Sequence, residues 1–300
     1  MKVAISGGGG FVGTALRASL RADGHDVLRL VRRKPAGPHE TQWDPAQGVL
    51  DVGDLAGVEA VVNLAGAGVG ARRWSRSYKR LVHDSRIRST ALLASGLAQL
   101  AEPPRVLVSA SGVSLYGPDR GDEVLDEESD AGDGFLAGLC HEWEQAAAPA
   151  RAADIAICHS RFGIVMDRSG GALGRLLPWY RLGLGGTLGN GRQFWSPISL
   201  HDTVRALRFL IEQHGCVGPY NLTAPEPLVQ AEFSRVLGQA VSRPRLLPVP
   251  ETALRLAVGQ YATEIVGSLN VLPTRLTQAG FEFDHPDARS IVGAGLTGFH

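Results

Sequence analysis

The chain lacks the features that mark metal-binding, membrane-spanning and nucleic-acid-binding proteins. Its three cysteines are odd in number and widely spaced and form no metal-ligand pattern, so we expect no metal site. No apolar run reaches the roughly 18 residues of a membrane span, and 30 basic residues balance 30 acidic ones. We therefore expect neither a membrane nor a nucleic acid as a partner. Because the first apolar strand starts at residue 3 and leaves no room for a signal peptide, we expect a cytoplasmic protein.

The N-terminal stretch has the pattern of a nucleotide-binding βαβ unit. A short apolar strand, Val3–Ile5, precedes Gly7, Gly10 and Gly13, and an amphipathic helical run follows. A second apolar run, Val27–Val31, completes the unit within about 30 residues. Glycines in the turn let the backbone approach a diphosphate, and the free N–H groups that open the helix attract anions. This combination predicts a dinucleotide site, with contacts from Gly7, Gly10, Phe11, Val12 and Gly13.

Basic residues follow the second strand of this unit. Arg32, Arg33 and Lys34 stand where an acidic residue would bind the ribose 2′-hydroxyl of NAD. A cation there suits a 2′-phosphate, although a solvated basic turn would have the same composition. We therefore expect NADP(H) rather than NAD as the cofactor, with Arg32 at the phosphate.

Strands and helices alternate through the first half of the chain. Apolar runs and helical patterns follow one another at 59–64, 74–100, 105–110, 135–148 and 153–159. This alternation predicts an α/β protein with a Rossmann-type, doubly wound parallel sheet. The first of these strands closes on the small-residue stretch Leu64, Ala65 and Gly66, where backbone can lie against the cofactor.

The composition changes beyond Arg161, where residues 167–197 are rich in glycine and carry clustered aromatic residues. We predict that residues 1–160 form the NADP-binding domain and that residues 161–300 form a smaller C-terminal α+β domain for the substrate. Residues 198–223 have the patterns of a helix and a strand, and we expect them to return to the first domain.

The glycine-rich part of the second domain offers polar side chains to a substrate. The predicted contacts are Arg161, Asn190, Arg192, Gln193 and Trp195. Amide, guanidinium and indole groups suit a polar planar or phosphorylated small molecule. The alternative is an irregular loop that Trp179 and Trp195 anchor.

Stretches along nearly the whole chain resemble the extended short-chain dehydrogenase/reductase family. The resemblance is greater to an atypical subgroup, often labelled a sugar-nucleotide epimerase family, that ends in a characteristic C-terminal domain. The stretches are SGGGGFVG, VVNLAGAGVGARRWS, HDSRIRST, FLAGLCHEWE, GGALGRLLPWYRLGLGGTLGNGRQFWSPISLHD, YNLTAPEP, LLPVPETALRLAVG and LPTRLTQAGFEF. The resemblance implies NADP(H) across the carboxyl edge of the sheet and a substrate cleft between the domains. It also implies that Arg86, in HDSRIRST, reaches the cofactor phosphates; a surface salt bridge is the alternative.

The catalytic pair of that superfamily, Tyr-x-x-x-Lys on a helix, is missing from the sequence. In the superfamily the lysine holds the ribose and lowers the pKa of the tyrosine, which passes a proton while hydride moves. None of the five tyrosines has a lysine four residues on, and the chain has only three lysines. In FLAGLCHEWE, Leu136 and Cys140 hold the positions of the pair. We expect Cys140 to line the nicotinamide-ribose pocket without taking part in the chemistry.

Two other residues are candidates for catalysis. Ser111 lies near the position of the family's serine, one residue further from Tyr116 than the common spacing, and a structural serine is the alternative. Tyr116 would be a second proton donor if Arg120 followed it by one helical turn. Gly117 and Pro118 argue against such a helix.

Two functions are consistent with these features. The first is an NADP(H)-dependent oxidoreductase or epimerase that acts on a small polar substrate, such as a sugar nucleotide, without the Tyr–Lys pair. The second is a non-catalytic NADPH-binding protein in which cofactor occupancy sets the angle between the domains and so the affinity for a partner. The missing pair motivates the second hypothesis, and fold analogy alone does not separate the two.

Overall fold

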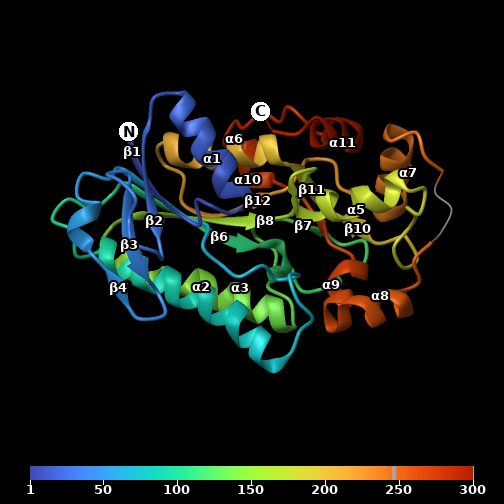
Figure 1. Cartoon of the computed structure of the whole chain (residues 1–300), viewed down its shortest axis with the longest axis horizontal. Coiled ribbons are helices and arrows are strands. Elements are labelled where there is room, and N and C mark those ends of the chain that lie inside the picture. The colour runs from blue at the N-terminus through green and yellow to red at the C-terminus, as the bar shows by residue number, and fades with distance from the viewer. Residues whose placement is uncertain (245–247, 300) are drawn as a thin grey trace.

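Figure 1 shows the computed structural model, which describes residues 1–244 and 248–299. Its centre is an eight-stranded sheet with the strand order β12-β8-β6-β5-β1-β2-β3-β4. These strands are β1 (Lys2–Ser6), β2 (Asp26–Val31), β3 (Glu40–Asp44), β4 (Val49–Leu50), β5 (Ala60–Asn63), β6 (Val106–Gly112), β8 (Ala156–Phe162) and β12 (Gly218–Leu222). Every neighbouring pair is parallel except β3 and β4. The predicted Rossmann-type α/β fold is confirmed.

Helices cover both faces of the sheet (Figure 1). The helices on one face are α1 (Phe11–Ala22) and α6 (Leu200–Glu212), and those on the other are α2 (Arg76–Leu97), α3 (Phe135–Gln145) and α4 (Ala148–Ala152). Successive strand residues point to opposite faces, so Val3 and Ile5 pack with α1 and α6 while Ala4 packs with α2. Because each face is buried under helices, the central strands β1 and β5 are mostly apolar.

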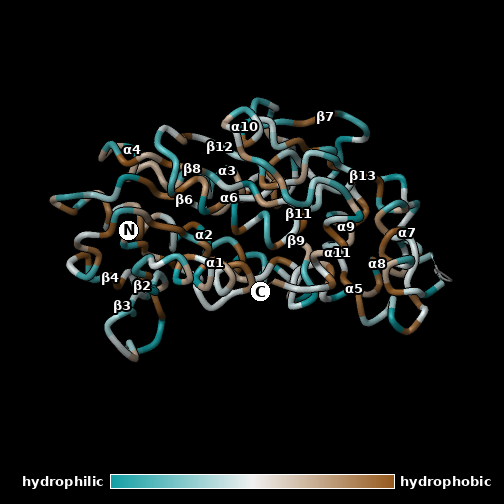
Figure 2. Tube along the Cα trace, turned by 90° about the horizontal axis from the view of Figure 1, so that it is seen from above, coloured by the Kyte–Doolittle hydropathy of each residue, from teal (hydrophilic) through white to brown (hydrophobic). Residues whose placement is uncertain are grey.

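The second half of the chain forms a smaller set of elements beside the carboxyl end of the sheet. They are β9 (Ile164–Asp167), α5 (Gly171–Arg181), β10 (Phe194–Trp195), β11 (Pro197–Ser199), β13 (Leu228–Val229), α7 (Gln230–Ala240), α8 (Glu251–Val258), α9 (Ala262–Val266), β14 (Asn270–Val271), α10 (Thr274–Gln278) and α11 (Ala288–Thr297). In both views α7 and α8 lie at the opposite end of the molecule from β3 and β4 (Figure 1 and Figure 2). Most of these elements share an apolar core that includes Leu173, Trp195 and Phe233, whereas β11 and α10 pack on the core of the sheet.

Four short elements complete the description, and part of the chain crosses back to the sheet. The short elements are β7 (Val124–Leu125), which pairs with β14, and the 3-10 turns η1 (Val52–Leu55), η2 (Val113–Tyr116) and η3 (Gly259–Tyr261). Although α6 and β12 follow residue 161, α6 packs on α1 and β12 pairs in parallel with β8. No helix among the described residues has the length and apolar character that crossing a membrane requires.

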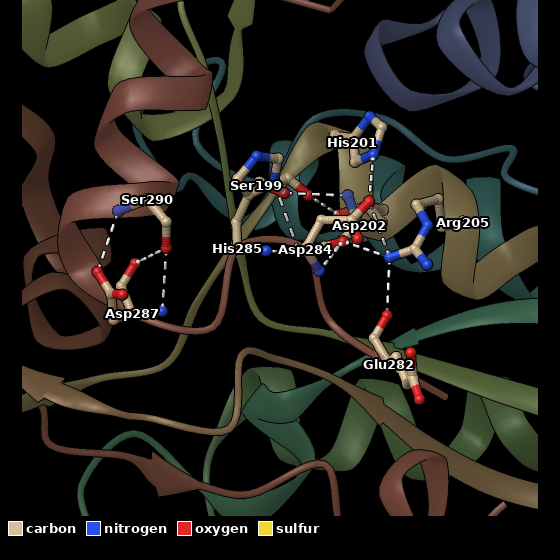
Figure 3. Close-up of polar contacts among 10 residues, drawn as sticks. Ser199, His201, Asp202, Arg205, Glu282, Asp284, His285, Asp287 and Ser290 are labelled. Atoms are coloured by element: carbon tan, nitrogen blue, oxygen red, sulfur yellow. Dashed lines mark hydrogen bonds and ion pairs between the residues drawn. The ribbon is translucent and has the colours of Figure 1, made fainter. Parts of the chain in front are cut away.

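A buried carboxylate holds the C-terminal segment on α6 (Figure 3). Asp202 is fully buried in the first turn of α6, and its oxygens accept the backbone N–H groups of Asp284 and His285 at 3.1 and 2.8 Å. Arg205 Nη1 donates to the same carboxylate at 3.0 Å. Ligand atoms of His201, Asp202 and Asp284 lie within 4.8 Å of one another, but these donors already occupy both Asp202 oxygens. The cluster is therefore a structural clasp between α6 and the segment that leads into α11.

Candidate functional site

The glycine turn lies against the end of β5 at a distance that no side chain would allow. A Cβ atom on Gly7, whose φ is +67°, would lie 2.6 Å from the carbonyl oxygen of Leu64. A Cβ on Gly13 would lie 2.3 Å from the carbonyl oxygen of Gly7. Helix α1 begins at Phe11 with Gly10 as its N-cap, which offers no side-chain cap. The first N–H groups of α1 are therefore free to bind an anion at the carboxyl edge of the sheet.

The first two residues of α1 connect this turn to the rest of the molecule. Phe11 and Val12 are half-buried and pack on the core between the sheet, α1 and α6. A Cβ on Gly170, at the start of α5, would lie 2.6 Å from the Phe11 ring. The turn between β9 and α5 therefore packs directly on the predicted cofactor loop.

Arginines surround a single carboxylate near the carboxyl end of β2 and the start of β3. Arg33 binds both Glu40 oxygens at 2.7 Å, and Arg29 Nη1 donates to Oε1 at 3.0 Å. Hydrogen bonds from Arg33 lower the pKa of Glu40 to about 2. The Arg29 guanidinium also lies beside the glycine turn, with Nη2 3.5 Å from the position of a Cβ on Gly9. The sequence analysis named Arg32, whose side chain is exposed here, but missed Arg29 and Glu40.

The loop after β5 rests on Arg86. The guanidinium Nη1 donates to the carbonyl oxygens of Ala67 and Val82, both at 2.9 Å, and Cζ lies 3.1 Å from the position of a Cβ on Gly66. The side chain is only 8% exposed, so the alternative of a surface salt bridge is wrong. Arg86 lies under Gly66 and Ala67 rather than at the glycine turn.

A buried polar network contains three of the predicted site residues. Ser111 Oγ donates to Glu144 Oε1 at 2.8 Å, and Arg161 binds both Glu144 oxygens at 2.8 and 3.0 Å. Arg161 also donates to the Tyr116 hydroxyl at 3.0 Å, and that hydroxyl donates to Asn221 Oδ1 at 2.9 Å. Burial opposes the ionisation of Glu144, but the Arg161 guanidinium outweighs it and holds the pKa of Glu144 below its ordinary value.

This network gives the surroundings of three predicted site residues. Tyr116 has no exposed surface, and burial raises its pKa, so its hydroxyl supports Arg161 instead of facing a ligand. Arg161 and Ser111 both donate hydrogen bonds to Glu144, and their predicted roles at the substrate and in catalysis stay predictions. Tyr116 ends a 3-10 turn, and no helix continues to Arg120, as Gly117 and Pro118 indicated.

The other predicted substrate residues divide into an exposed and a buried pair. Asn190 and Arg192 are exposed, and the Asn190 side chain accepts the backbone N–H of Arg192. Gln193 and Trp195 point inward: Gln193 Nε2 donates to the Leu188 carbonyl at 2.8 Å, and the Trp195 ring packs on Phe233. Trp195 therefore anchors the loop. Trp179, the second proposed anchor, is 58% exposed and does not.

Cys140 lies beside the end of β6. Its sulfur is 3.6 Å from the position of a Cβ on Gly112, and the side chain is buried. Burial raises the pKa of the thiol to about 12, so it stays protonated and is a poor nucleophile. Leu136, one turn earlier on α3, is buried in an apolar cluster with Tyr78 and Val82.

The structure adds an ionisable group that the sequence did not reveal. Glu264 on α9 lies close to Ser114 of η2, the turn that directly follows β6, and to Lys79 of α2. Burial raises the pKa of Glu264 to about 7, against the opposing effects of a hydrogen bond from Ser114 and the charge of Lys79. This carboxyl group therefore changes its charge near neutral pH.

Aromatic rings surround the same region. Trp74 lies edge-on to Phe135 at 5.2 Å and tilted to Tyr261 at 5.5 Å between ring centroids. Lys79 Nζ lies 5.1 and 4.9 Å from the Trp74 and Phe135 centroids. These residues come from α2 and the segment just before it, from α3 and from η3, so they assemble only in the folded chain. No local pattern predicts their meeting.

Two protein families match parts of this chain, and a bacterial protein matches nearly all of it. Residues 3–135 match the NAD dependent epimerase/dehydratase family, and residues 249–293 match a domain of unknown function, DUF1731. An epimerase family protein of Mycobacterium bovis is 44% identical over 297 residues, which cover 98% of this chain and 97% of that protein.

Two solved structures share the fold over nearly all of this chain. The human epimerase family protein SDR39U1, solved with NADPH, is 32% identical with a TM-score of 0.89 and covers 97% of this chain and 98% of its own. A nucleoside-diphosphate sugar epimerase from Corynebacterium glutamicum is 31% identical with a TM-score of 0.82. It covers 99% of this chain and 58% of its own.

The buried pair of Glu144 and Arg161 gives a test of the network. We expect Glu144→Gln to lower the free energy of unfolding by about 3–5 kcal/mol, because it leaves the Arg161 charge buried without a partner. Urea denaturation measures this loss. Folding lowers the pKa of Glu144 below 4.5, so the ion pair contributes fully to the free energy of unfolding above that pH. As the pH falls below it, the difference in free energy of unfolding between Glu144→Gln and the parent protein becomes smaller.

Glu142→Gln is the matched control, because Glu142 lies on the same helix but is 59% exposed in its pair with His83. We expect that variant to change the free energy of unfolding by less than about 1 kcal/mol. Equal stability of the two variants at neutral pH would contradict the network's structural role.

Proposed function

The chain belongs to the NAD dependent epimerase/dehydratase family of the short-chain dehydrogenase/reductase superfamily, and from this premise we propose that it is an NADP(H)-dependent oxidoreductase or epimerase. Its substrate is a small polar molecule such as a sugar nucleotide. The observation that carries the proposal is the glycine turn at the free N-terminus of α1, next to an arginine cluster near the carboxyl end of β2 and the start of β3.

The residues present fit NADP(H) along the edge of the sheet. The first N–H groups of α1 and the backbone of Gly7–Gly13 would hold the diphosphate. Arg32 would bind the 2′-phosphate, with Arg29 and Arg33 adjacent to it. Support for NADP(H) also comes from the related human protein, whose structure was solved with NADPH. The bound cofactor would supply or accept the hydride, while the chain's residues orient the reactants and exchange the proton.

We assign the proton transfer to Glu264. Its carboxyl group lies near η2, which directly follows the carboxyl end of β6, and ligands of open α/β sheets bind outside these strand ends. A group that titrates near neutrality is suited to donate and accept a proton at physiological pH. In this scheme Glu264 takes the part that the tyrosine of the Tyr–Lys pair has elsewhere in the superfamily.

A second function has one observation in its favour. The start of α5 packs on Phe11, so a ligand that displaces the glycine turn would also shift the C-terminal elements. This coupling suits a non-catalytic protein that reports NADPH occupancy to a partner. This function requires NADPH and NADP⁺ to bind with different affinities and to give the protein different shapes. Small-angle scattering of the protein with each cofactor measures the difference in shape, and calorimetry measures the affinities.

The choice of cofactor is tested at Arg32. We expect Arg32→Ala to weaken NADPH binding about tenfold or more, because a hydrogen-bonded charge pair with the 2′-phosphate is lost, and to leave NADH binding unchanged. Isothermal titration calorimetry measures both affinities. Arg21→Ala removes an exposed arginine from the last turn of α1 and serves as the control. Equal binding of NADH and NADPH to the parent protein would refute the assignment.

The catalytic hypothesis is tested at Glu264. Once a panel of carbonyl compounds and sugar nucleotides has identified a substrate, we expect Glu264→Gln to lower kcat at least a hundredfold while NADPH affinity stays within about twofold. Reduction needs the protonated carboxyl, so its rate should fall as the pH rises through about 7, whereas the reverse oxidation should become faster.

Glu251→Gln, an exposed substitution on α8, is the control for this experiment and should keep full activity. An unchanged kcat in Glu264→Gln would exclude Glu264 as the proton-transfer group. Silence of the parent protein across the whole panel would instead favour the non-catalytic function.

A further inference from the structure

The Arg86 guanidinium is buried without a counter-ion. Within residues 1–244 and 248–299, no carboxylate lies within 4.0 Å of its nitrogens. Nη1 donates to two backbone carbonyls, but Nη2 and Nε have no hydrogen-bond partner in that part of the chain. Neither of these nitrogens is completely enclosed. Buried charges in proteins are normally paired, so this arrangement needs an explanation.

The surroundings of the guanidinium place it at the carboxyl ends of β5 and β6. Gly66 of the loop after β5 lies above it, and the ring of Trp143 on α3 lies 4.9 Å from Cζ. The Cys140 side chain is a neighbour of the guanidinium, and its sulfur lies beside Gly112, the last residue of β6. Arg86 therefore places a positive charge near the ends of both strands.

The strand order indicates which part of a dinucleotide meets this charge. The arginine cluster around Glu40 lies at β2 and β3, on one side of β1, whereas β5 and β6 lie on the other side. An adenosine bound at the arginine cluster places the opposite end of the cofactor over β5 and β6. In addition, α1 covers one face of the sheet and Arg86 belongs to α2 on the other, so the diphosphate at α1 and the group at Arg86 are different parts of the ligand.

We propose that Arg86 binds the vicinal hydroxyls of the nicotinamide ribose through Nη2 and Nε. Arg86 on α2 thereby replaces the lysine of the Tyr-x-x-x-Lys pair, whose position on α3 is occupied by Cys140. The planar guanidinium presents parallel donors to two adjacent oxygens, which a diol on a ribose offers. This inference rests on the proposed function, because it assumes a bound NADP(H). Arg86 is a binding and positioning residue in this scheme and exchanges no proton.

A series of NADP fragments tests the assignment without any need for turnover. The probes are NADPH, 2′-phospho-ADP-ribose, 2′-phosphoadenosine 5′-diphosphate and 2′,5′-ADP. We expect Arg86→Met to weaken the first two about tenfold to a hundredfold, the usual loss of hydrogen bonds to a charged group, and the last two less than about twofold. Calorimetry on the full chain measures each affinity. Arg88→Met, an exposed substitution two residues along the same helix, is the control.

A charge exchange between the helices separates ligand binding from loop support. Arg86→Met also removes the hydrogen bonds to the carbonyl oxygens of Ala67 and Val82. We therefore expect a lower melting temperature, which is measured together with the affinities. In the double variant Arg86→Met, Cys140→Lys, a cation returns from α3 but the hydrogen bonds to these carbonyls do not. We expect NADPH affinity to recover to within about threefold of the parent protein without recovery of the melting temperature.

The outcomes divide clearly. The proposal is overturned if Arg86→Met leaves NADPH affinity unchanged, or if it weakens the binding of 2′-phosphoadenosine 5′-diphosphate or of all four probes equally. It is also overturned if NADPH affinity does not recover in the double variant. Failure of the parent protein to bind any of the four probes would instead overturn the proposed function on which it rests.

Discussion

The contact between the glycine turn and the end of β5 is the constraint on which the site depends. Gly7 brings the turn so close to Leu64 that any side chain would collide with the backbone. The same approach fixes where α1 begins, and therefore where its free N–H groups point. Because Phe11 is the first residue of α1 and packs on the start of α5, this contact also ties the cofactor turn to the C-terminal elements.

The parallel strands bring buried polar groups to one edge of the sheet. Ser111 and Arg161 are register partners in β6 and β8, and Glu144 of α3 holds both. Their ion pair is buried, so it contributes chiefly by making other arrangements of these strand ends unfavourable. Arg86 differs from this network because its charge is not balanced within the described chain. One arginine thus maintains the scaffold, and the other is left with hydrogen-bond donors for a ligand.

The fold was predictable because its signals are local. The glycine spacing, the apolar runs and the helical patterns each lie within one segment, and the structure has the parallel sheet that they predict. The partners of polar side chains were not predictable in the same way. Glu144 and Arg161 are 17 residues apart and lie on different elements, so no local pattern indicated that they pair. No sequence pattern singled out Glu264, a glutamate on a short helix. Its pKa is unusual only because other parts of the folded chain bury it.

The most direct test of the account is a crystal structure of the protein with bound NADPH. The account predicts the 2′-phosphate at Arg32, the diphosphate at the N-terminus of α1, and the nicotinamide ribose over the ends of β5 and β6. Density for the nicotinamide on the β2 and β3 side of β1, or for the whole dinucleotide away from the glycine turn, would contradict it.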